Sequence, residues 1–169
     1  MQLETFIRNV PDFPKPGIMF KDITPLLQAP HAFAETIERM AAEWQGKADI
    51  VAGLDARGFI FGAALAMRLG LPFLMIRKKG KLPGKVESVS YGLEYGSDMI
   101  EISTESLPEG TGVLIVDDLL ATGGTAKAAA TLVEKVGFKV AGFAFVVELS
   151  DLNGRRNLGS ESISSVLTY

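Results

Sequence analysis

Two adjacent carboxylates precede a glycine pair in VLIVDDLLATGGT, residues 113–125. The run of β-branched and aliphatic residues at its start favours a buried strand, which ends at Asp117 and Asp118. A short loop then leads into a predicted helix and consists of Ala121, Thr122, Gly123, Gly124 and Thr125. Backbone N–H groups in such a loop, beside the positive end of the helix dipole, form a cradle for phosphate. For these glycines taken alone, a capped turn without a ligand is an equal alternative.

Two common phosphate-binding motifs do not describe this loop. The Walker A spacing GxxxxGK[ST] is absent, because Lys127 falls inside the predicted helix, and no GxGxxG follows the strand. Acids beside a phosphate cradle repel the phosphate unless sugar hydroxyls or a divalent cation occupy them. Two acids in tandem also exceed what a helix cap requires. A sugar phosphate with free hydroxyls therefore satisfies both halves of the segment.

Basic side chains follow two other predicted strands. AGLDARGFIFG, residues 52–62, places Arg57 after a buried strand, where the alternative is an exposed arginine beside a helix capped by Asp55. A polar, glycine-rich stretch over 77–97 begins with four cations: Arg77, Lys78, Lys79 and Lys81. A run of charge is usually only a solvated surface. Beside a second anion-binding edge, it predicts a flexible clamp for a highly charged group such as pyrophosphate.

The elements that must position these segments alternate between strands and helices. Buried strands are predicted at 49–54, 71–76, 112–118 and 138–149, and helices at 30–46, 58–70 and 125–137. Residues 98–103 alternate like an antiparallel edge strand, and 162–167 predict one more strand. This order predicts an α/β fold with a mainly parallel twisted sheet flanked by helices. Ligands of such sheets lie beyond the C-terminal ends of the strands, where the three segments meet.

The N-terminal part is expected to differ from the rest. A short helix is predicted over 2–10, and prolines halt it, so that 11–30 is expected to be loop. The 169 residues hold apolar material for one core, which predicts a single domain over 1–169.

Composition excludes several classes of protein. Hydrophobic residues make up 47% and charged residues 22%, as in ordinary globular chains. The net charge of −3 argues against a nucleic-acid-binding protein, and the lack of cysteine excludes disulfides and a thiol nucleophile. No signal peptide is recognisable, and no stretch approaches the roughly 18 apolar residues of a membrane span. We therefore expect a cytoplasmic protein with no nucleic-acid or membrane partner.

The segment 113–125 resembles the phosphoribosyl pyrophosphate binding motif of the type I phosphoribosyltransferases. Four more segments resemble the adenine phosphoribosyltransferases within that family: FPKPGIMFKDITPLL (13–27), AGLDARGFIFG (52–62), IRKKGKLPG (76–84) and SYGLEYG (90–96). Together they cover almost the whole chain in the family's order. The resemblance implies the type I fold with a small N-terminal base-binding hood, over about residues 1–30, and a flexible loop.

The same resemblance implies a reaction. The phosphoribosyl group of phosphoribosyl pyrophosphate is transferred to N9 of adenine with Mg²⁺, giving AMP and pyrophosphate, which is a step of purine salvage. Two alternatives stay open: a regulator that kept the ligand cradle but lost catalysis, and an enzyme for hypoxanthine, xanthine or another base. A regulator of that kind adds a basic DNA-binding segment, for which this chain has neither the length nor the charge.

Roles for individual residues follow from the resemblance. Residues 121–125 are expected at the ribose 5-phosphate, and Asp117 and Asp118 at the ribose hydroxyls. Pyrophosphate is expected at Asp55, Ala56, Arg57, Arg77, Lys78 and Lys81, with a cis peptide bond between Asp55 and Ala56. The base is expected against the ring of Phe20, with its edge read by main-chain groups of Met19, Phe20 and Lys21.

Catalytic groups are implied in the same way. Glu94 is expected to transfer the adenine proton, with Tyr95 beside it and Arg57 completing the set. Mg²⁺ is expected to be held mainly by the substrate, so that no protein ligand is assigned. A homodimer is expected, in which Arg77 acts across the interface.

Overall fold

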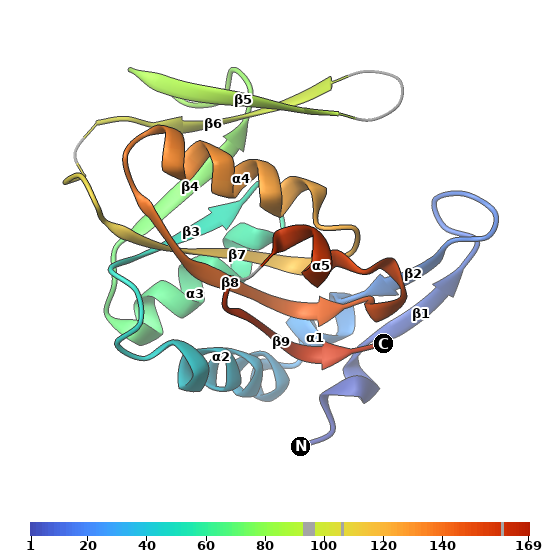
Figure 1. Ribbon diagram of the computed structural model, residues 1–169. Helices are drawn as coiled ribbons and strands as arrows, with labels where there is room; N and C mark the ends of the chain where they lie inside the picture. Colours follow the sequence, from blue (N-terminus) through green and yellow to red (C-terminus); the bar gives the residue numbers. More distant parts are fainter. Residues whose placement is uncertain (93–96, 106, 160) are drawn as a thin grey trace.

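The computed structural model describes residues 1–92, 97–105, 107–159 and 161–169. Within these residues a seven-stranded sheet has the order β5-β6-β4-β3-β7-β8-β9 (Figure 1). Its strands are β3 (Ile50–Leu54), β4 (Phe73–Lys78), β5 (Val86–Gly92), β6 (Ser97–Ser103), β7 (Gly112–Leu120), β8 (Lys139–Glu148) and β9 (Ile163–Thr168). The five strands from β4 to β9 in that order are parallel. The strand β6 pairs antiparallel with both β4 and β5. The predicted α/β fold with a mainly parallel sheet is confirmed.

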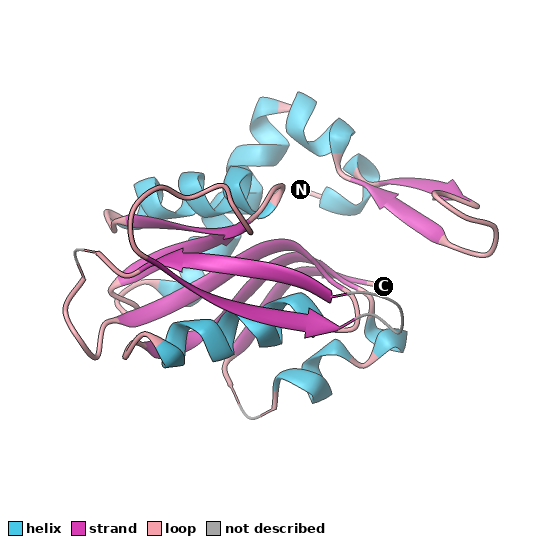
Figure 2. Ribbon diagram, turned by 90° about the horizontal axis from the view of Figure 1, so that it is seen from above, coloured by secondary structure: helices cyan, strands magenta, loops and turns pink. Residues whose placement is uncertain are grey.

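Helices cover both faces of this sheet (Figures 1 and 2). On one face lie α2 (Pro30–Trp44) and α3 (Gly58–Leu69), and on the other lie α4 (Gly124–Lys135) and the short α5 (Gly154–Leu158). Successive strand residues pack into opposite layers: Val51 and Leu114 contact the α2 and α3 side, whereas Ala52 and Ile115 contact the α4 side. A strand buried on both faces reads as a continuous apolar run, which is why these strands were recognisable. No described helix is both long and apolar enough to cross a membrane.

The N-terminal part differs from the prediction. The helix expected over 2–10 is wrong beyond residue 6, and the loop expected over 11–30 is wrong in part. The observed elements are the 3-10 turn η1 (Leu3–Phe6), the strands β1 (Arg8–Pro11) and β2 (Met19–Asp22), and α1 (Thr24–Gln28). The two strands pair antiparallel, with Val10 opposite Phe20. Because each strand finds its hydrogen-bond partners about ten residues away, spacing within either one does not reveal it.

The described part of the stretch 77–97, residues 77–92 and 97, also differs from the predicted loop. Its first two residues extend β4, residues 86–92 form β5, and 79–85 connect them. Residues 98–103 do form an antiparallel strand, but β5 covers β6 and is itself the edge. The strand β5 is polar because it is only half-buried, and Lys135 of α4 donates to its Ser88 carbonyl at 3.1 Å. The 3-10 turn η2 (Ser150–Leu152) and α5 complete the chain between β8 and β9.

Candidate active site

The three predicted segments follow neighbouring strands of the sheet. Leu54 of β3 lies beside Ile76 of β4, and Gly53 lies beside Val116 of β7. Arg57 follows β3, and Arg77 lies near the C-terminal end of β4, so both are at the same edge of the sheet. The two acids after Val116 lie at this edge within β7, which continues to Leu120, so the predicted strand end at residue 118 is two residues too early. The start of α3 sits tightly against β7, because a Cβ on Gly58 would lie 2.7 Å from the Val116 carbonyl oxygen.

The loop 121–125 turns directly into α4. Gly123 has a φ of 83°, in the left-handed region that favours glycine, and Gly124 is the first residue of the helix. Among the described residues no side chain caps this N-terminus, so its first N–H groups are free of helix partners. They border a hollow of about 80 Å³, which is lined by Asp117, Leu119, Leu120, Ala121, Thr122, Gly123, Gly124, Thr125 and Ala126. Its donors and dipole make this hollow suited to an anion.

The two acids have different environments. Asp118 is buried, and its Oδ2 lies 3.0 Å from Nε of Arg57. Asp117 accepts a hydrogen bond from the Asp118 backbone N–H through Oδ1 at 2.9 Å. Burial and the neighbouring charge of Asp118 raise the pKa of Asp117 well above its ordinary value. One acid is thus neutralised by an arginine, and the other is left to hydrogen-bond a ligand.

The carboxylates bear on the expected Mg²⁺. Within the part of the chain that the structure describes, no three His, Cys, Asp or Glu side chains converge as a metal site. Mg²⁺ in proteins is often bound by one or two carboxylates while phosphates of the substrate supply the other ligands. The pair Asp117 and Asp118, with one member already in an ion pair, fits an ion of that kind rather than a permanently bound metal.

The turn after β3 has the predicted cis peptide bond between Asp55 and Ala56. The assignment of Asp55 and its turn to the pyrophosphate stays a prediction. The Asp55 carboxylate faces β4: Oδ2 lies 3.4 Å from Nε of Arg77 and accepts from the Lys78 N–H at 3.3 Å. Arg77 in turn donates to the Lys81 carbonyl at 3.4 Å. The side chains of Lys78 and Lys81 are exposed. Asp55 therefore holds the start of the basic segment in place.

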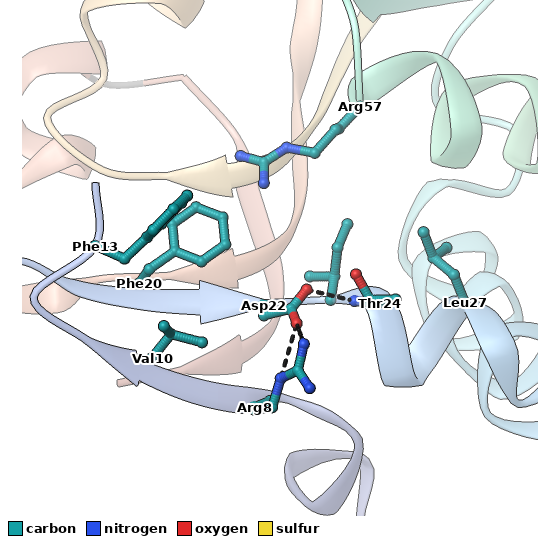
Figure 3. A pocket seen from close by; sticks show the side chains of 9 residues that line it. Arg8, Val10, Phe13, Phe20, Asp22, Thr24, Leu27 and Arg57 are labelled. Atoms are coloured by element: carbon teal, nitrogen blue, oxygen red, sulfur yellow. Dashed lines mark hydrogen bonds and ion pairs between the residues drawn. The ribbon is translucent and has the colours of Figure 1, made fainter.

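A pocket of about 450 Å³ lies between the N-terminal strands and Arg57, which both line it (Figure 3). Its apolar lining comes from Val10, Phe13, Phe20, Ile23 and Leu27, and its polar lining from Arg8, Asp22, Thr24 and Arg57. The rings of Phe13 and Phe20 meet edge to face with centroids 5.1 Å apart, and the Arg57 guanidinium lies 5.5 Å from the Phe20 ring. Flat apolar walls with a few polar groups at the rim suit a planar heterocycle.

An ion pair fastens the wall of this pocket. Asp22 at the end of β2 accepts from Nε of Arg8 on β1 at 3.0 Å and from the Thr24 N–H at 2.9 Å, at the first residue of α1. The hydrogen bonds from Thr24, and then those from Arg8, lower the pKa of Asp22. Asp22 thereby ties three elements together behind the pocket.

Of the residues expected at the base, Phe20 lines the pocket. Met19 is half exposed, and Nζ of Lys21 points away, 2.8 Å from Oδ1 of Asn9 and 3.7 Å from the Tyr169 ring centre. The reading of the base edge by their main-chain groups stays a prediction. Glu94 and Tyr95 lie outside the described residues.

Sequence reasoning missed most of this pocket. Arg8 and Val10 were assigned to a helix, and only the β1–β2 pairing brings them beside Phe20. A signal for Asp22 was present, because an acid two residues before Thr24-Pro25 is typical of a helix start. Phe13 lies within a segment quoted for the family resemblance, but nothing in its spacing marks it as part of a site.

Comparison with known proteins agrees with this geometry. The family model described as Phosphoribosyl transferase domain matches residues 21–163. The adenine phosphoribosyltransferase of Nostoc punctiforme is 49% identical over 172 residues, covering 100% of both chains. That of Synechococcus sp. (strain JA-3-3Ab) is 55% identical and covers 95% of this chain and 93% of its own.

Solved structures are similar over the same length. The adenine phosphoribosyltransferase of Thermoanaerobacter pseudethanolicus has a TM-score of 0.95 and 49% identity, covering 99% of this chain and 98% of that one. The Saccharomyces cerevisiae enzyme, solved with an imino-altritol bisphosphate and adenine, has a TM-score of 0.93 and 39% identity, covering 98% and 97%. Identity near one half over the full length exceeds what a shared fold alone requires, and the chain belongs to the adenine phosphoribosyltransferase family.

Proposed function

We propose that the protein transfers the phosphoribosyl group of phosphoribosyl pyrophosphate to N9 of adenine, forming AMP and releasing pyrophosphate. The position of Arg57 carries this proposal. Its guanidinium faces the aromatic pocket on one side, and its Nε pairs with Asp118 beside the phosphate loop on the other. The proposed base, sugar and phosphate sites thus lie in the spatial order of the three parts of a nucleotide. The relatives named for this activity support the assignment.

The base is assigned to the aromatic pocket. Adenine stacks on the Phe20 ring, under a hood formed by residues 1–30 within a single domain, and main-chain groups of residues 19–21 read its edge. A relative solved with adenine supports this choice of base. Stacking accepts any purine, so selection rests on hydrogen bonds that a 6-oxopurine leaves unpaired.

The sugar and its phosphates are assigned to the sheet edge. Amide groups of 121–125 bind the 5-phosphate. The carboxylates of Asp117 and Asp118 accept hydrogen bonds from the ribose hydroxyls. The departing pyrophosphate is assigned to the turn of Asp55, Ala56 and Arg57 together with Lys78 and Lys81. The basic groups of this set, with Arg77 of the partner subunit, balance its charge. Mg²⁺, when bound with the substrate, supplies further positive charge at the pyrophosphate.

Proton transfer is assigned to Glu94. As N9 of adenine bonds to C1 of the ribose, the bond from C1 to the pyrophosphate oxygen breaks, and the electron pair leaves with the pyrophosphate. N9 loses its proton in the same step, and Glu94 is the acceptor, with Tyr95 beside it. This assignment rests on the resemblance of the SYGLEYG segment.

A homodimer in the cytoplasm completes the proposal. Three large apolar side chains are exposed on and beside α3: Ile60 and Met67 on the helix and Met75 on β4. An apolar face of this kind on a folded domain is typical of a protein interface. We assign it to a second copy of the chain, whose site receives Arg77.

A single assay tests the function. Purified protein is mixed with phosphoribosyl pyrophosphate, Mg²⁺ and adenine, hypoxanthine, guanine or xanthine in turn, and pyrophosphate release is followed. Turnover with adenine alone is expected. Substrate binding without turnover would identify a regulator instead, and turnover with another base would correct the substrate.

A variant tests the proton acceptor. E94A is expected to lower kcat by about a hundredfold with little change in phosphoribosyl pyrophosphate affinity, because general-base catalysis contributes on this scale. E109A, which removes an exposed loop acid elsewhere, is the control and should match the parent. Full activity of E94A would remove Glu94 from the mechanism.

A further inference from the structure

The short helix α5 packs against the loop assigned to the 5-phosphate. Gly154, its first residue, is so close to the loop that a Cβ there would lie 2.4 Å from the Ala121 carbonyl oxygen. A Cβ on Gly123 would likewise lie 2.9 Å from the Gly154 carbonyl oxygen. Asn157, one turn further on, donates from Nδ2 to the Thr122 carbonyl at 2.6 Å. Two consecutive loop carbonyls thus face α5.

The direction of these carbonyls sets the direction of the next amides. In a planar trans peptide, the C=O and the N–H of one unit point in opposite directions. With the Ala121 and Thr122 carbonyls turned to α5, the N–H groups of Thr122 and Gly123 point away from it. Consecutive N–H groups that share one direction form an anion-binding concavity.

The helix is itself held firmly. Arg155 places Nε 2.7 and 3.0 Å from the two carboxylate oxygens of Glu148 on β8, and donates from Nη1 to the Ile163 carbonyl at 3.0 Å. Glu148 is buried and also accepts from the Ser165 hydroxyl at 2.7 Å. Leu158 is buried in the core beneath α4. With these anchors on β8, β9 and the core, α5 is a fixed support from which Asn157 reaches the loop.

We propose that Asn157 is a positioning residue for the phosphate loop: by holding the Thr122 carbonyl, it aims the Gly123 N–H at the 5-phosphate. This inference rests on the proposed function, because it takes the 5-phosphate as the ligand of residues 121–125. Asn157 is exposed, so core packing does not explain its contact. The hydrogen bond orients a group that binds substrate without touching the substrate itself.

Steady-state kinetics with two variants tests this role. N157A is expected to raise KM for phosphoribosyl pyrophosphate about fivefold, the equivalent of one hydrogen bond, with KM for adenine and the unfolding midpoint unchanged. N157D keeps the shape of the side chain but replaces the donor with a carboxylate, and it is expected to be at least as impaired. R156A, an exposed neighbour on the same helix, is the matched control and should behave like the parent.

Binding of ribose 5-phosphate, measured by calorimetry, separates this inference from the proposed function. N157A should raise its Kd about fivefold whether or not the protein turns over adenine. An unchanged Kd, full rescue by N157D, or no binding by the parent would overturn the role of Asn157. Equal losses for adenine and ribose 5-phosphate would do the same, because they would indicate a general structural defect. Binding by the parent without turnover would overturn the proposed function alone.

Discussion

Arg57 is the residue on which both halves of the site depend. Asp118 holds its Nε at 3.0 Å, which leaves the outer part of the guanidinium directed to the aromatic pocket (Figure 3). Neither contact is a strong energetic term alone, because the arginine side chain is 42% exposed. Their value is geometric: the buried Asp118 fixes the position of a cation between the two proposed ligand sites.

Phe20 is expected to dominate the affinity for adenine. F20A removes the stacking surface and should raise KM for adenine about tenfold, because stacking of a base on an aromatic ring contributes about 1–3 kcal/mol. KM for phosphoribosyl pyrophosphate should stay unchanged. F20Y retains the ring and serves as the control. A comparable rise of KM for both substrates would show that the ring supports the hood rather than the base.

Asp117 is expected to lower the free energy of unfolding near neutral pH, although the proposed activity requires it. Its pKa is raised, so between the ordinary and the raised value the folded chain keeps a proton that the unfolded chain has lost. Stability therefore falls as pH rises through that interval. D117N removes this effect and should increase the free energy of unfolding by about 1 kcal/mol near neutral pH, with lower activity.

Denaturant unfolding at about pH 4 and about pH 8 checks the sign, because the difference between D117N and the parent should shrink at the acid end. D117N that is less stable than the parent at neutral pH would contradict the prediction.

At the scale of elements, the hood depends on contacts between segments rather than on its own core. The strands β1 and β2 form a two-stranded sheet, which is marginal in isolation. Asp22 joins β1, β2 and α1, and its side chain is only 12% exposed. Asp22 is therefore the polar side chain that joins these three elements of the hood.

D22A is expected to lower the free energy of unfolding by about 2 kcal/mol, since it removes a charge-assisted hydrogen bond and a helix-start acceptor. Because the folded pKa of Asp22 is lowered, this contribution is present near neutral pH and is lost as pH falls through that value. Denaturant unfolding measures it.

The exposed pair of Glu38 and Arg68 provides the control for D22A. E38A should lower the free energy of unfolding much less than D22A does, because such surface pairs contribute little. If D22A and E38A lower the free energy of unfolding equally, Asp22 contributes no more than an ordinary surface ion pair.

At the scale of the whole molecule, the α3 side carries an apolar face. Met75 is 41% exposed although β4 lies inside the sheet, and Met67 on α3 is 81% exposed. Exposed methionines suit an interface, because the thioether chain adapts to a partner surface.

M67E is expected to weaken the proposed homodimer by about tenfold or more, because it replaces the most exposed apolar side chain of this face with a charge. Size-exclusion chromatography with light scattering measures the change in mass with concentration. L152E, at an exposed leucine on η2, is the control. If M67E and the parent have the same mass at every concentration, this face is not the interface.

Prediction from sequence succeeded where the signal is local. Apolar runs located β3, β7 and β8, Gly70 ended its helix at the C-cap, and the helix predicted to end at Gly46 ends two residues earlier, at Trp44. It failed for β1, β2, β5 and α5, whose hydrogen bonds and packing come from segments elsewhere in the chain. Pairing of this kind leaves little periodicity in a polar four- to seven-residue strand.

The sequence by itself determined the α/β fold, the segments that meet at the sheet edge and the family, because strand and helix periodicity and long motifs are properties of contiguous residues. The tertiary structure alone decided which side chains share a site. It placed Arg8 and Val10 in one pocket with Phe20, turned Asp55 toward Arg77, and set Asn157 against the loop 121–125. Those contacts join residues that are far apart along the chain, and only the packed fold determines which of them meet.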